Sequence, residues 1–379
     1  MKVVFRADAS GFMGTGHVTR CATLAETLQA RGAQTTFVCR EFPGNLIAPL
    51  REKAAVRVLP APIQSTPVTG DDYAVWLGVP ESTDAHETTA ALHGDRPDWL
   101  VVDHYALGTE WEQQLRPHVG RLLVIDDLAN RSHECDALLD QNYSDEGEGR
   151  HRGLVPGHSR LLVGPRYALL ASAYASHRGT QPARVGTIRR VLVYFGGSDP
   201  FNLSGPTLTV LSEPEFSHLA VDLVVGMNHP QREALERQAT GRPGTCVHGS
   251  RPHLADLMVS ADLAIGAGGM STWERMCLGL PALVVSLAEN QRPTCEALAA
   301  AGLIQYAGDA GSVGVTQIRD ALGSLIEDRD HLAALSSRGQ LLVDGHGASR
   351  VADFMLGRPA DLTRARDASQ RVPFGKKPL

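Results

Sequence analysis

The 379-residue sequence predicts an α/β protein with two domains in tandem, on three observations. Short apolar runs alternate with longer helix-like segments, which is typical of parallel sheets flanked by helices. At roughly 100 to 200 residues per domain, the length suggests about two domains. Residues 172–187 lose apolar strand character and gain Gly, Pro and basic residues, so we interpret them as a linker.

The first half contains five clear strand candidates and one clear helix. The strand candidates are residues 3–5, 36–38, 56–59, 99–102 and 122–125, and a later strand ends at Asp140. The helix follows His17, because apolar residues recur at three- and four-residue steps from Val18 to Leu28, and Gly32 is placed to end it.

The second half repeats the same plan. Its strand candidates are residues 191–195, 221–225, 245–247, 263–265 and 282–285, and the pattern turns helical from 317 to about 356. We therefore predict an N-terminal Rossmann-like domain of residues 1–171, the linker, a C-terminal Rossmann-like domain of residues 188–357, and a basic, flexible tail of residues 358–379.

The composition excludes several classes of protein. Lys plus Arg number 36 and Asp plus Glu 42, a formal net charge of −6, so there is no broad electrostatic case for nucleic acid or an anionic membrane. The six cysteines are widely spaced without a CxxC pair, which argues against a zinc knuckle or a disulfide framework and favours a reducing cytoplasm. No apolar run approaches the roughly 18 residues of a membrane span, and no export signal is visible.

The loop that follows the first strand is rich in glycine and ends at a histidine. Gly11, Gly14 and Gly16 would let the backbone approach an anionic ligand, although the spacing matches neither the dinucleotide motif nor the Walker motif. His17 would lie at a helix N-terminus, where the dipole favours the neutral imidazole that can accept a proton. His17 is thus a candidate general base. The sequence fits equally well with a histidine that only starts the helix and hydrogen-bonds locally.

Polar residues follow the apolar strands of the first half. Asp103, His104 and Tyr105 come directly after strand 99–102, where open α/β sheets bind ligands, although Asp103 could instead cap a helix. The acidic pair Asp126-Asp127 ends the next strand and Asp140-Gln141-Asn142 closes a later one, but no His or third acid lies at metal-ligand spacing. We therefore predict capping or domain-interface roles there, and no metal.

Two glycine turns of the second half could hold a diphosphate. Gly197 and Ser198 follow a strand, and their N–H groups could face phosphate oxygens, although a tight turn alone would explain them. Asn202 or Ser204 would cap the helix that follows. Gly268 and Gly269 precede a helix that starts near Ser271.

Around that second turn, three kinds of side chain could add to the binding. The Ser271 and Thr272 hydroxyls could donate to phosphate. Glu274 could accept from the ribose hydroxyls, or could close a capping box with Ser271. Asn290 and Gln291 could donate to phosphate or sugar, or Asn290 could be an N-cap.

These motifs together resemble the UDP-2,4-diacetamido-2,4,6-trideoxy-β-L-altropyranose hydrolases of pseudaminic acid biosynthesis. The resemblance spans about residues 1–357 and rests on the stretches 5–10, 14–21, 76–79, 101–105, 125–131, 139–142, 195–199 and 266–291. It implies the GT-B architecture, in which two Rossmann-like domains face each other across a cleft and the C-terminal one holds the nucleotide.

The resemblance also implies a reaction in which water replaces UDP at the anomeric carbon with inversion, and His17 is the catalytic base. We expect the substrate to contact Asp8, Gly14, Gly16, Asp103, His104, Tyr105, Asn142, Asn290 and Gln291. We expect UDP to contact Gly197, Ser198, Gly268, Gly269, Ser271, Thr272 and Glu274. The expected partner is a small-molecule UDP-sugar, without metal or other cofactor. The chain departs from the family pattern at Met270 and at 171–178, which leaves the exact sugar open.

Three other functions fit parts of the pattern. An inverting GT-B glycosyltransferase would use the same UDP-aminosugar donor with an acceptor hydroxyl, but the first half shows no amphipathic stripe for a lipid acceptor. A UDP-sugar 2-epimerase shares the scaffold. A catalytically inactive nucleotide-sugar binding protein would have no need of both His17 and Glu274.

Overall fold

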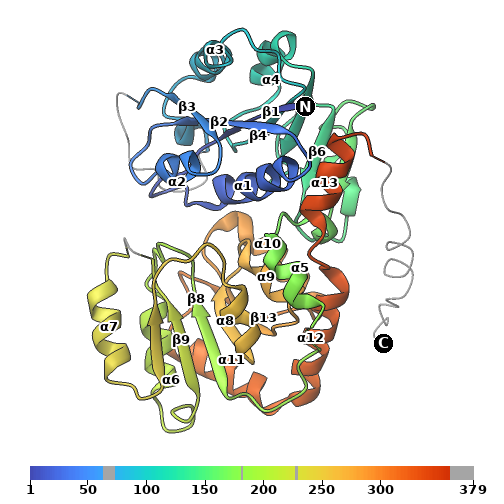
Figure 1. Cartoon of the computed structure of the whole chain (residues 1–379). Coiled ribbons are helices and arrows are strands. Elements are labelled where there is room, and N and C mark those ends of the chain that lie inside the picture. Colours follow the sequence, from blue (N-terminus) through green and yellow to red (C-terminus); the bar gives the residue numbers. More distant parts are fainter. Residues whose placement is uncertain (63–72, 181, 227–228, 359–379) are drawn as a thin grey trace. The chain divides into compact units, whose positions relative to one another are not determined.

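The computed structural model describes residues 1–62, 73–180, 182–226 and 229–358 (Figure 1). The chain forms two compact units, the first built from Met1–Leu169 with 346–358, and the second from Leu170–Gly345. Each unit contains one parallel β-sheet with helices, so the predicted α/β class with two Rossmann-like units is confirmed.

The sheet of the first unit has the order β3-β2-β1-β4-β5-β6-β7 in the described residues, and every neighbouring pair is parallel. The strands are β1 (Lys2–Ala7), β2 (Gln34–Arg40), β3 (Ala55–Leu59), β4 (Trp99–Asp103), β5 (Arg121–Ile125), β6 (Ala137–Asp140) and β7 (Arg160–Val163). The helices are α1 (Gly16–Gln29), α2 (Ile47–Arg51), α3 (Glu81–Ala91), α4 (Thr109–Leu115) and α13 (Gly347–Met355). Short 3-10 helices are η1 (Tyr73–Leu77), η2 (Arg116–His118), η3 (Gly147–His151) and η4 (Pro165–Tyr167).

Both faces of this sheet are buried, because alternate residues of a strand point to opposite sides. Val3 and Phe5 pack with residues of α1 and α13, whereas Val4 packs with residues of α3 and α4. The helix predicted after His17 is α1, and Gly32 adopts φ +87° just beyond its end, as a glycine that terminates a helix does.

The sheet of the second unit has the order β10-β9-β8-β11-β12-β13 in the described residues, again all parallel. The strands are β8 (Arg190–Tyr194), β9 (Ala220–Val224), β10 (Thr245–His248), β11 (Leu263–Ala267), β12 (Ala282–Ser286) and β13 (Gln305–Asp309). The helices are α5 (Ser172–Arg178), α6 (Ser204–Leu211), α7 (Arg232–Thr240), α8 (Ala255–Ser260), α9 (Ser271–Cys277), α10 (Arg292–Ala300), α11 (Val315–Glu327) and α12 (Arg329–Leu342), with η5 (Glu289–Gln291). On one face, Val191 and Val193 of β8 pack with residues of α6, α7, α11 and α12.

Each sheet has one point at which the strand order reverses. This switch point lies between β1 and β4 in the first unit, and between β8 and β11 in the second. Because open α/β sheets bind ligands outside the carboxyl ends of the strands at such points, the loops after these four strands are the candidate binding segments.

The structure differs from the expected boundaries in two places. Residues 172–178 of the expected linker form α5, whose Tyr174 is 1% exposed, and Arg184 donates to the Met258 carbonyl at 2.6 Å and to the Ala261 carbonyl at 2.9 Å. Helix α13 belongs to the first unit, although residues 188–357 were assigned to the second. Residue 181 of the linker and 359–379 of the predicted tail lie outside the described residues.

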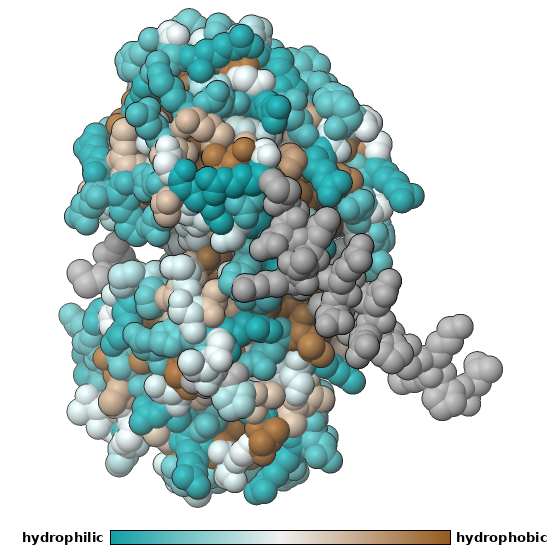
Figure 2. All heavy atoms as spheres, turned by 45° about the vertical axis from the view of Figure 1, so that its right-hand side comes forward, coloured by the Kyte–Doolittle hydropathy of each residue, from teal (hydrophilic) through white to brown (hydrophobic). Residues whose placement is uncertain are grey.

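The surface shown in Figure 2 is mainly hydrophilic, with small separate hydrophobic areas. Large apolar side chains that are exposed in the described residues are Phe12, Val58, Val75, Val185, Phe201 and Leu341. Within the same residues, no helix combines the length and the apolar character that crossing a bilayer requires.

Candidate functional site

The loop after β1 delivers His17 to the start of α1. Gly14 adopts φ +75° and its N–H donates to the Ser10 carbonyl at 3.0 Å, while the Ser10 hydroxyl accepts from the Met13 N–H at 3.0 Å. A side chain at Gly14 would be strained in this backbone region. Gly14 and Gly16 are partly exposed, so the loop presents its backbone around the start of the helix.

His17 is the second residue of α1 and is only 8% exposed. Its imidazole packs edge-on against the Tyr105 ring, with centroids 4.6 Å apart, and lies 6.3 Å from the Trp76 ring. Burial lowers the pKa of His17, and the nearby Arg20 charge lowers it further, although Asp103 opposes this. The imidazole is therefore neutral at pH 7 and able to accept a proton.

An ion-pair network below His17 joins α1 to the loops after β4 and β5. Arg20 forms a bidentate pair with Asp103 at 2.6 and 2.7 Å and a second pair with Asp127 at 2.7 Å. The Tyr105 hydroxyl donates to the other Asp127 oxygen at 2.6 Å. Burial raises the pKa of Asp103, but the Arg20 charge outweighs burial, and the pKa ends below its ordinary value. The network fixes the rings that pack against His17.

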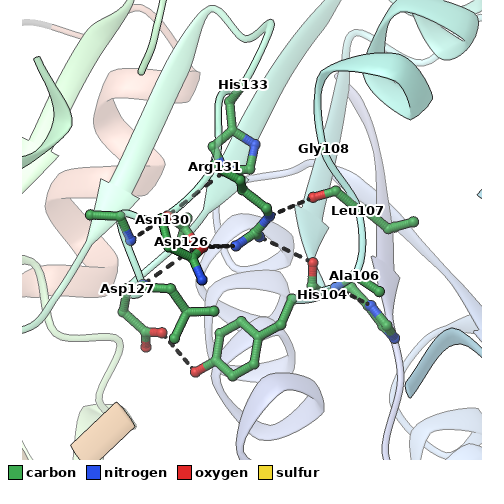
Figure 3. A network of polar contacts seen from close by, with 12 residues as sticks. His104, Ala106, Leu107, Gly108, Asp126, Asp127, Asn130, Arg131 and His133 are labelled. Carbon is green, nitrogen blue, oxygen red and sulfur yellow. Dashed lines mark hydrogen bonds and ion pairs between the residues drawn. The ribbon is translucent and has the colours of Figure 1, made fainter. Parts of the chain in front are cut away.

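Arg131 holds the loops after β4 and β5 together (Figure 3). Its guanidinium donates to the Leu107 carbonyl at 2.9 Å, to the His104 carbonyl at 3.3 Å and to Asp126 at 2.8 Å. Asp126 also accepts from the Ala129 N–H at 3.0 Å and so orders the turn.

Two of the expected substrate contacts are enclosed by protein groups. Asp8 is 0% exposed, accepts from the Arg40 N–H at 2.7 Å and pairs with Arg6 at 2.7 Å. His104 is buried, and burial lowers its pKa to about 4. Its Nδ1 accepts from the Ala106 N–H at 3.1 Å, which puts the ring proton on Nε2, 3.6 Å from Asp8. In this structure Asp8 and His104 support the loops rather than face solvent, and Asp103 does the same through Arg20.

Beneath Asp8 lies a buried charge cluster that the sequence analysis did not identify. Asp84 on α3 accepts from Arg6 and Arg40, each at 2.6 Å, and from the Trp111 indole at 3.0 Å. These charges satisfy one another in the interior, and they hold β1 and β2 to α3.

Asn142 follows β6, at the same edge of the sheet but away from the switch point. Its N–H donates to Asp140 at 2.9 Å, and it is partly exposed. The structure gives it no link to His17, so its substrate contact stays a prediction.

In the second unit, the loop after β8 exposes two of the expected UDP contacts. Gly196 adopts φ +92°, and Gly197 and Ser198 are exposed. No group in the described residues accepts from the N–H of Gly197 or Ser198. The predicted cap is wrong, because Asp199 instead of Asn202 or Ser204 caps α6, accepting from the N–H groups of residues 203 and 204 at 2.9 Å.

The loop after β11 uses its two glycines differently. The Gly268 N–H donates to the Val285 carbonyl at 3.0 Å, so it is not available to a phosphate. A Cβ at Gly268 would lie 2.3 Å from the Cys295 sulfur, which explains the glycine sterically. Gly269 has no acceptor for its N–H among the described residues and lies beside the Gln291 amide.

Gln291 and the two hydroxyl residues complete this turn. The Gln291 Oε1 accepts from the Leu287 N–H at 2.9 Å. The Nε2 of the same amide is therefore the atom that faces Gly269. The hydroxyl oxygens of Ser271 and Thr272 accept from Arg275 at 3.4 and 2.9 Å, so their O–H groups remain donors. Thr272 is 1% exposed and Ser271 is 8% exposed, which makes Ser271 the more accessible of the two.

Glu274 does not close a capping box. The residue before α9 is Met270, and no side chain caps the helix. Instead Glu274 accepts a hydrogen bond from Tyr174 of α5, whose oxygen in turn accepts from the Leu254 N–H at 3.1 Å. Burial raises the pKa of Glu274 to about 6, while the Tyr174 hydrogen bond partly opposes it. The partly exposed carboxylate keeps acceptor capacity for a ligand.

The alternative that Asn290 caps a helix is wrong. Asn290 lies within η5, and the residue before α10 is Gln291, so Asn290 is not the N-cap of that helix. In the part of the chain that the structure describes, no three His, Cys, Asp or Glu side chains are grouped to hold a metal ion.

The comparisons with known proteins agree with this fold. No protein-family model matches the chain. The spore coat polysaccharide biosynthesis protein SpsG of Bacillus subtilis is 26% identical over 354 residues, 93% of this chain and 96% of that protein. The UDP-2,4-diacetamido-2,4,6-trideoxy-beta-L-altropyranose hydrolase of Campylobacter jejuni is 23% identical over 305 residues, 80% of this chain and 97% of that protein.

Among solved structures, Acinetobacter baumannii MurG matches with a TM-score of 0.63 and 14% identity, over 94% of this chain and 99% of that chain. A Staphylococcus aureus MnaA structure with UDP matches with a TM-score of 0.58 and 13% identity, over 95% of this chain and 98% of that chain. The chain therefore has a GT-B fold, and its distant homologues include a protein named as a UDP-sugar hydrolase.

Proposed function

We propose that the protein hydrolyses a UDP-linked diacetamido-trideoxyhexose, UDP-2,4-diacetamido-2,4,6-trideoxy-β-L-altropyranose or a close UDP-aminosugar, with inversion at the anomeric carbon. The observation that carries the proposal is the neutral, buried His17 at the start of α1, beside the switch point of the first sheet. The distant homology to a hydrolase of this name adds support.

In this reaction His17 acts as the general base. A water oxygen attacks the anomeric carbon while His17 takes one of its protons, and the bond from that carbon to the diphosphate oxygen breaks. The bonding electrons leave with UDP. One displacement with a single base inverts the configuration. A neutral imidazole is needed at the start, which the lowered pKa of His17 provides.

UDP is assigned to the second unit. The N–H groups of Gly197, Ser198 and Gly269, which have no acceptor among the described residues, can bear the charge that develops on the leaving diphosphate. Glu274 can accept from the ribose hydroxyls. Gly268 offers no free N–H, and its role is to leave room where a side chain would meet Cys295. The Gln291 amide and the Ser271 hydroxyl can add hydrogen-bond donors near Gly269.

A panel of UDP-aminosugars, incubated with the purified protein and no acceptor, tests this function. NMR would follow the release of UDP and the configuration of the first-formed free sugar. We expect UDP and the inverted sugar to appear together, and the rate of their release to fall by about 10²–10⁴-fold in His17→Asn. A donor that is stable alone but consumed when an acceptor hydroxyl is added would instead identify an inverting glycosyltransferase.

A further inference from the structure

A cluster of four aromatic side chains lies beside His17 in the first unit. Phe12, Tyr73, Trp76 and Tyr105 form what we call the aromatic wall. The Trp76 ring lies 4.9 Å from Tyr73, 5.6 Å from Tyr105 and 6.3 Å from Phe12, between ring centroids. His17 contacts the wall through Tyr105 and Trp76.

The wall is built from three separate segments and is not core. Phe12 comes from the loop after β1, Tyr73 and Trp76 from η1, and Tyr105 from the loop after β4. Phe12 is 39% exposed, and Tyr73 and Trp76 are partly exposed. The other three tryptophans, Trp99, Trp111 and Trp273, are at most 2% exposed. Aromatic surface left in water beside a candidate base points to a ligand that covers it.

Tyr105 and Phe12 contribute ring surface rather than hydrogen bonds to the wall. The Tyr105 hydroxyl is already committed to Asp127 at 2.6 Å, so this residue presents its ring to His17. The Trp76 and Phe12 rings bind C–H and methyl groups well, whereas a hydroxyl group placed against them would lose its water without a new partner.

We propose that the aromatic wall, with Trp76 at its centre, binds the sugar next to His17 and selects sugars that place methyl groups, from the 6-deoxy carbon and the acetamido groups, where common hexoses carry hydroxyls. The inference rests on the proposed function, since it gives the specificity of the same site. Pockets of this kind discriminate by about 10- to 200-fold per altered apolar group.

The kinetic test compares Trp76→Ala, Trp76→Phe and the matched control Val75→Ala, an exposed neighbour in η1. Each variant is assayed with the UDP-diacetamido-trideoxyhexose and with UDP-N-acetylglucosamine, and UDP affinity is measured by calorimetry. We expect Trp76→Ala to lower kcat/KM for the first substrate by about 10- to 200-fold and to reduce the preference between the two, with UDP affinity unchanged. Trp76→Phe should keep most of the preference, and Val75→Ala all of it.

A binding test separates this inference from the proposed function. Trp76 is the partly exposed tryptophan of the four in the chain, so quenching of tryptophan fluorescence by the free 2,4-diacetamido-2,4,6-trideoxyhexose reports on the wall. We expect saturable quenching by this sugar, little by glucose, and none in Trp76→Phe.

The possible outcomes distinguish the two claims. If the wild type releases no UDP from any donor but the sugar still quenches Trp76 fluorescence, the proposed hydrolysis is wrong and sugar binding by the aromatic wall is supported. If the wild type hydrolyses its donor while Trp76→Ala keeps the full preference between the two substrates, the proposed role of the aromatic wall is wrong and the proposed hydrolysis is supported. Absence of quenching in the wild type also refutes the wall.

Discussion

His17 releases its proton more readily than a free imidazole, because burial disfavours the imidazolium and Arg20 adds to this effect. As general base it must be neutral, so activity should fall as the pH drops through its pKa. The acid limb of kcat/KM is therefore expected below pH 6.5, the ordinary value. A limb at or above pH 6.5 would contradict the assignment.

Substitution of His17 by Asn removes the base and keeps a polar side chain of similar size. We expect turnover to fall by about 10²–10⁴-fold, the usual contribution of general-base catalysis. UDP affinity should stay within twofold of the wild type, because the proposed UDP contacts lie in the second unit. Steady-state kinetics and calorimetry measure the two quantities, and unchanged turnover would exclude the role.

Tyr174 is expected to position Glu274 and to tune its ionisation. Its hydrogen bond favours the carboxylate, so Tyr174→Phe should raise the pKa of Glu274 above about 6. Ribose binding needs the ionised acceptor, and UDP affinity should therefore weaken as the pH falls through this pKa, at a higher pH in the variant. Calorimetry from pH 5 to 8 measures the shift. Glu274→Gln is the control and should bind UDP weakly at every pH.

Protonation of Glu274 is expected to weaken UDP binding, but it stabilises the folded chain. The pKa of Glu274 is higher in the folded chain than its ordinary value of 4.5, so the folded state binds the extra proton. Its contribution to stability therefore increases as the pH falls from about 6 to 4.5. Protonation of Glu274 by itself therefore does not destabilise the folded chain.

At the residue scale, the sequence predicted the place of His17 at the start of α1 and of the glycine turns after β8 and β11, because each is encoded by a local motif; their roles stay predictions. The partners that hold them are distant in the chain. Arg20 and Asp103 are 83 residues apart, and Arg6 and Asp84 are 78 apart. Whether a glycine amide is free also depends on tertiary pairing, as the Gly268 bond to Val285 shows.

At the scale of elements, the ten strand candidates all correspond to strands, with ends that agree within two residues, because most of their apolar runs are buried in the sheets. β7 and β13 were not predicted. Both are edge strands with partly exposed residues, and β13 has the sequence QYAGD, with no β-branched residue. β13 therefore lacks the continuous apolar pattern that marks a buried strand.

The turn from β11 into α9 depends on the absence of a side chain at Gly268. Gly268→Ala would place a Cβ 2.3 Å from the Cys295 sulfur of α10, and one of them must move. We expect a loss of about 1–3 kcal/mol in the free energy of unfolding, together with weaker UDP binding. Thermal unfolding and calorimetry measure both.

Cys295→Ala supplies the matched rescue, because it removes the sulfur that the new methyl group would meet. The double variant should recover most of the UDP affinity that Gly268→Ala loses. If the double variant binds UDP as weakly as Gly268→Ala alone, the steric explanation is wrong.

At the scale of the whole molecule, the chain enters the second unit after Leu169 and returns to the first at residue 346. The returning helix α13 completes the first unit. Val351 is buried against the α1 side of the sheet, and the Trp99 indole donates to the Met355 carbonyl at 3.0 Å. The stability of the unit that carries His17 therefore depends on a segment more than 300 residues away in sequence.

Val351→Asp tests this dependence. Val351 is 0% exposed, and an unpaired charge at such a position costs about 3–5 kcal/mol. The control is Asp353→Ala on the same helix, which breaks only the partly exposed pair with Arg31 at 3.5 Å and should cost about 0–1 kcal/mol. Denaturant unfolding, followed by hydrogen exchange in each unit, should show the loss in the first unit alone. UDP binding should survive in Val351→Asp while turnover is lost, because the proposed base and the proposed nucleotide contacts belong to different units. Equal loss of both would mean that the two units unfold as one.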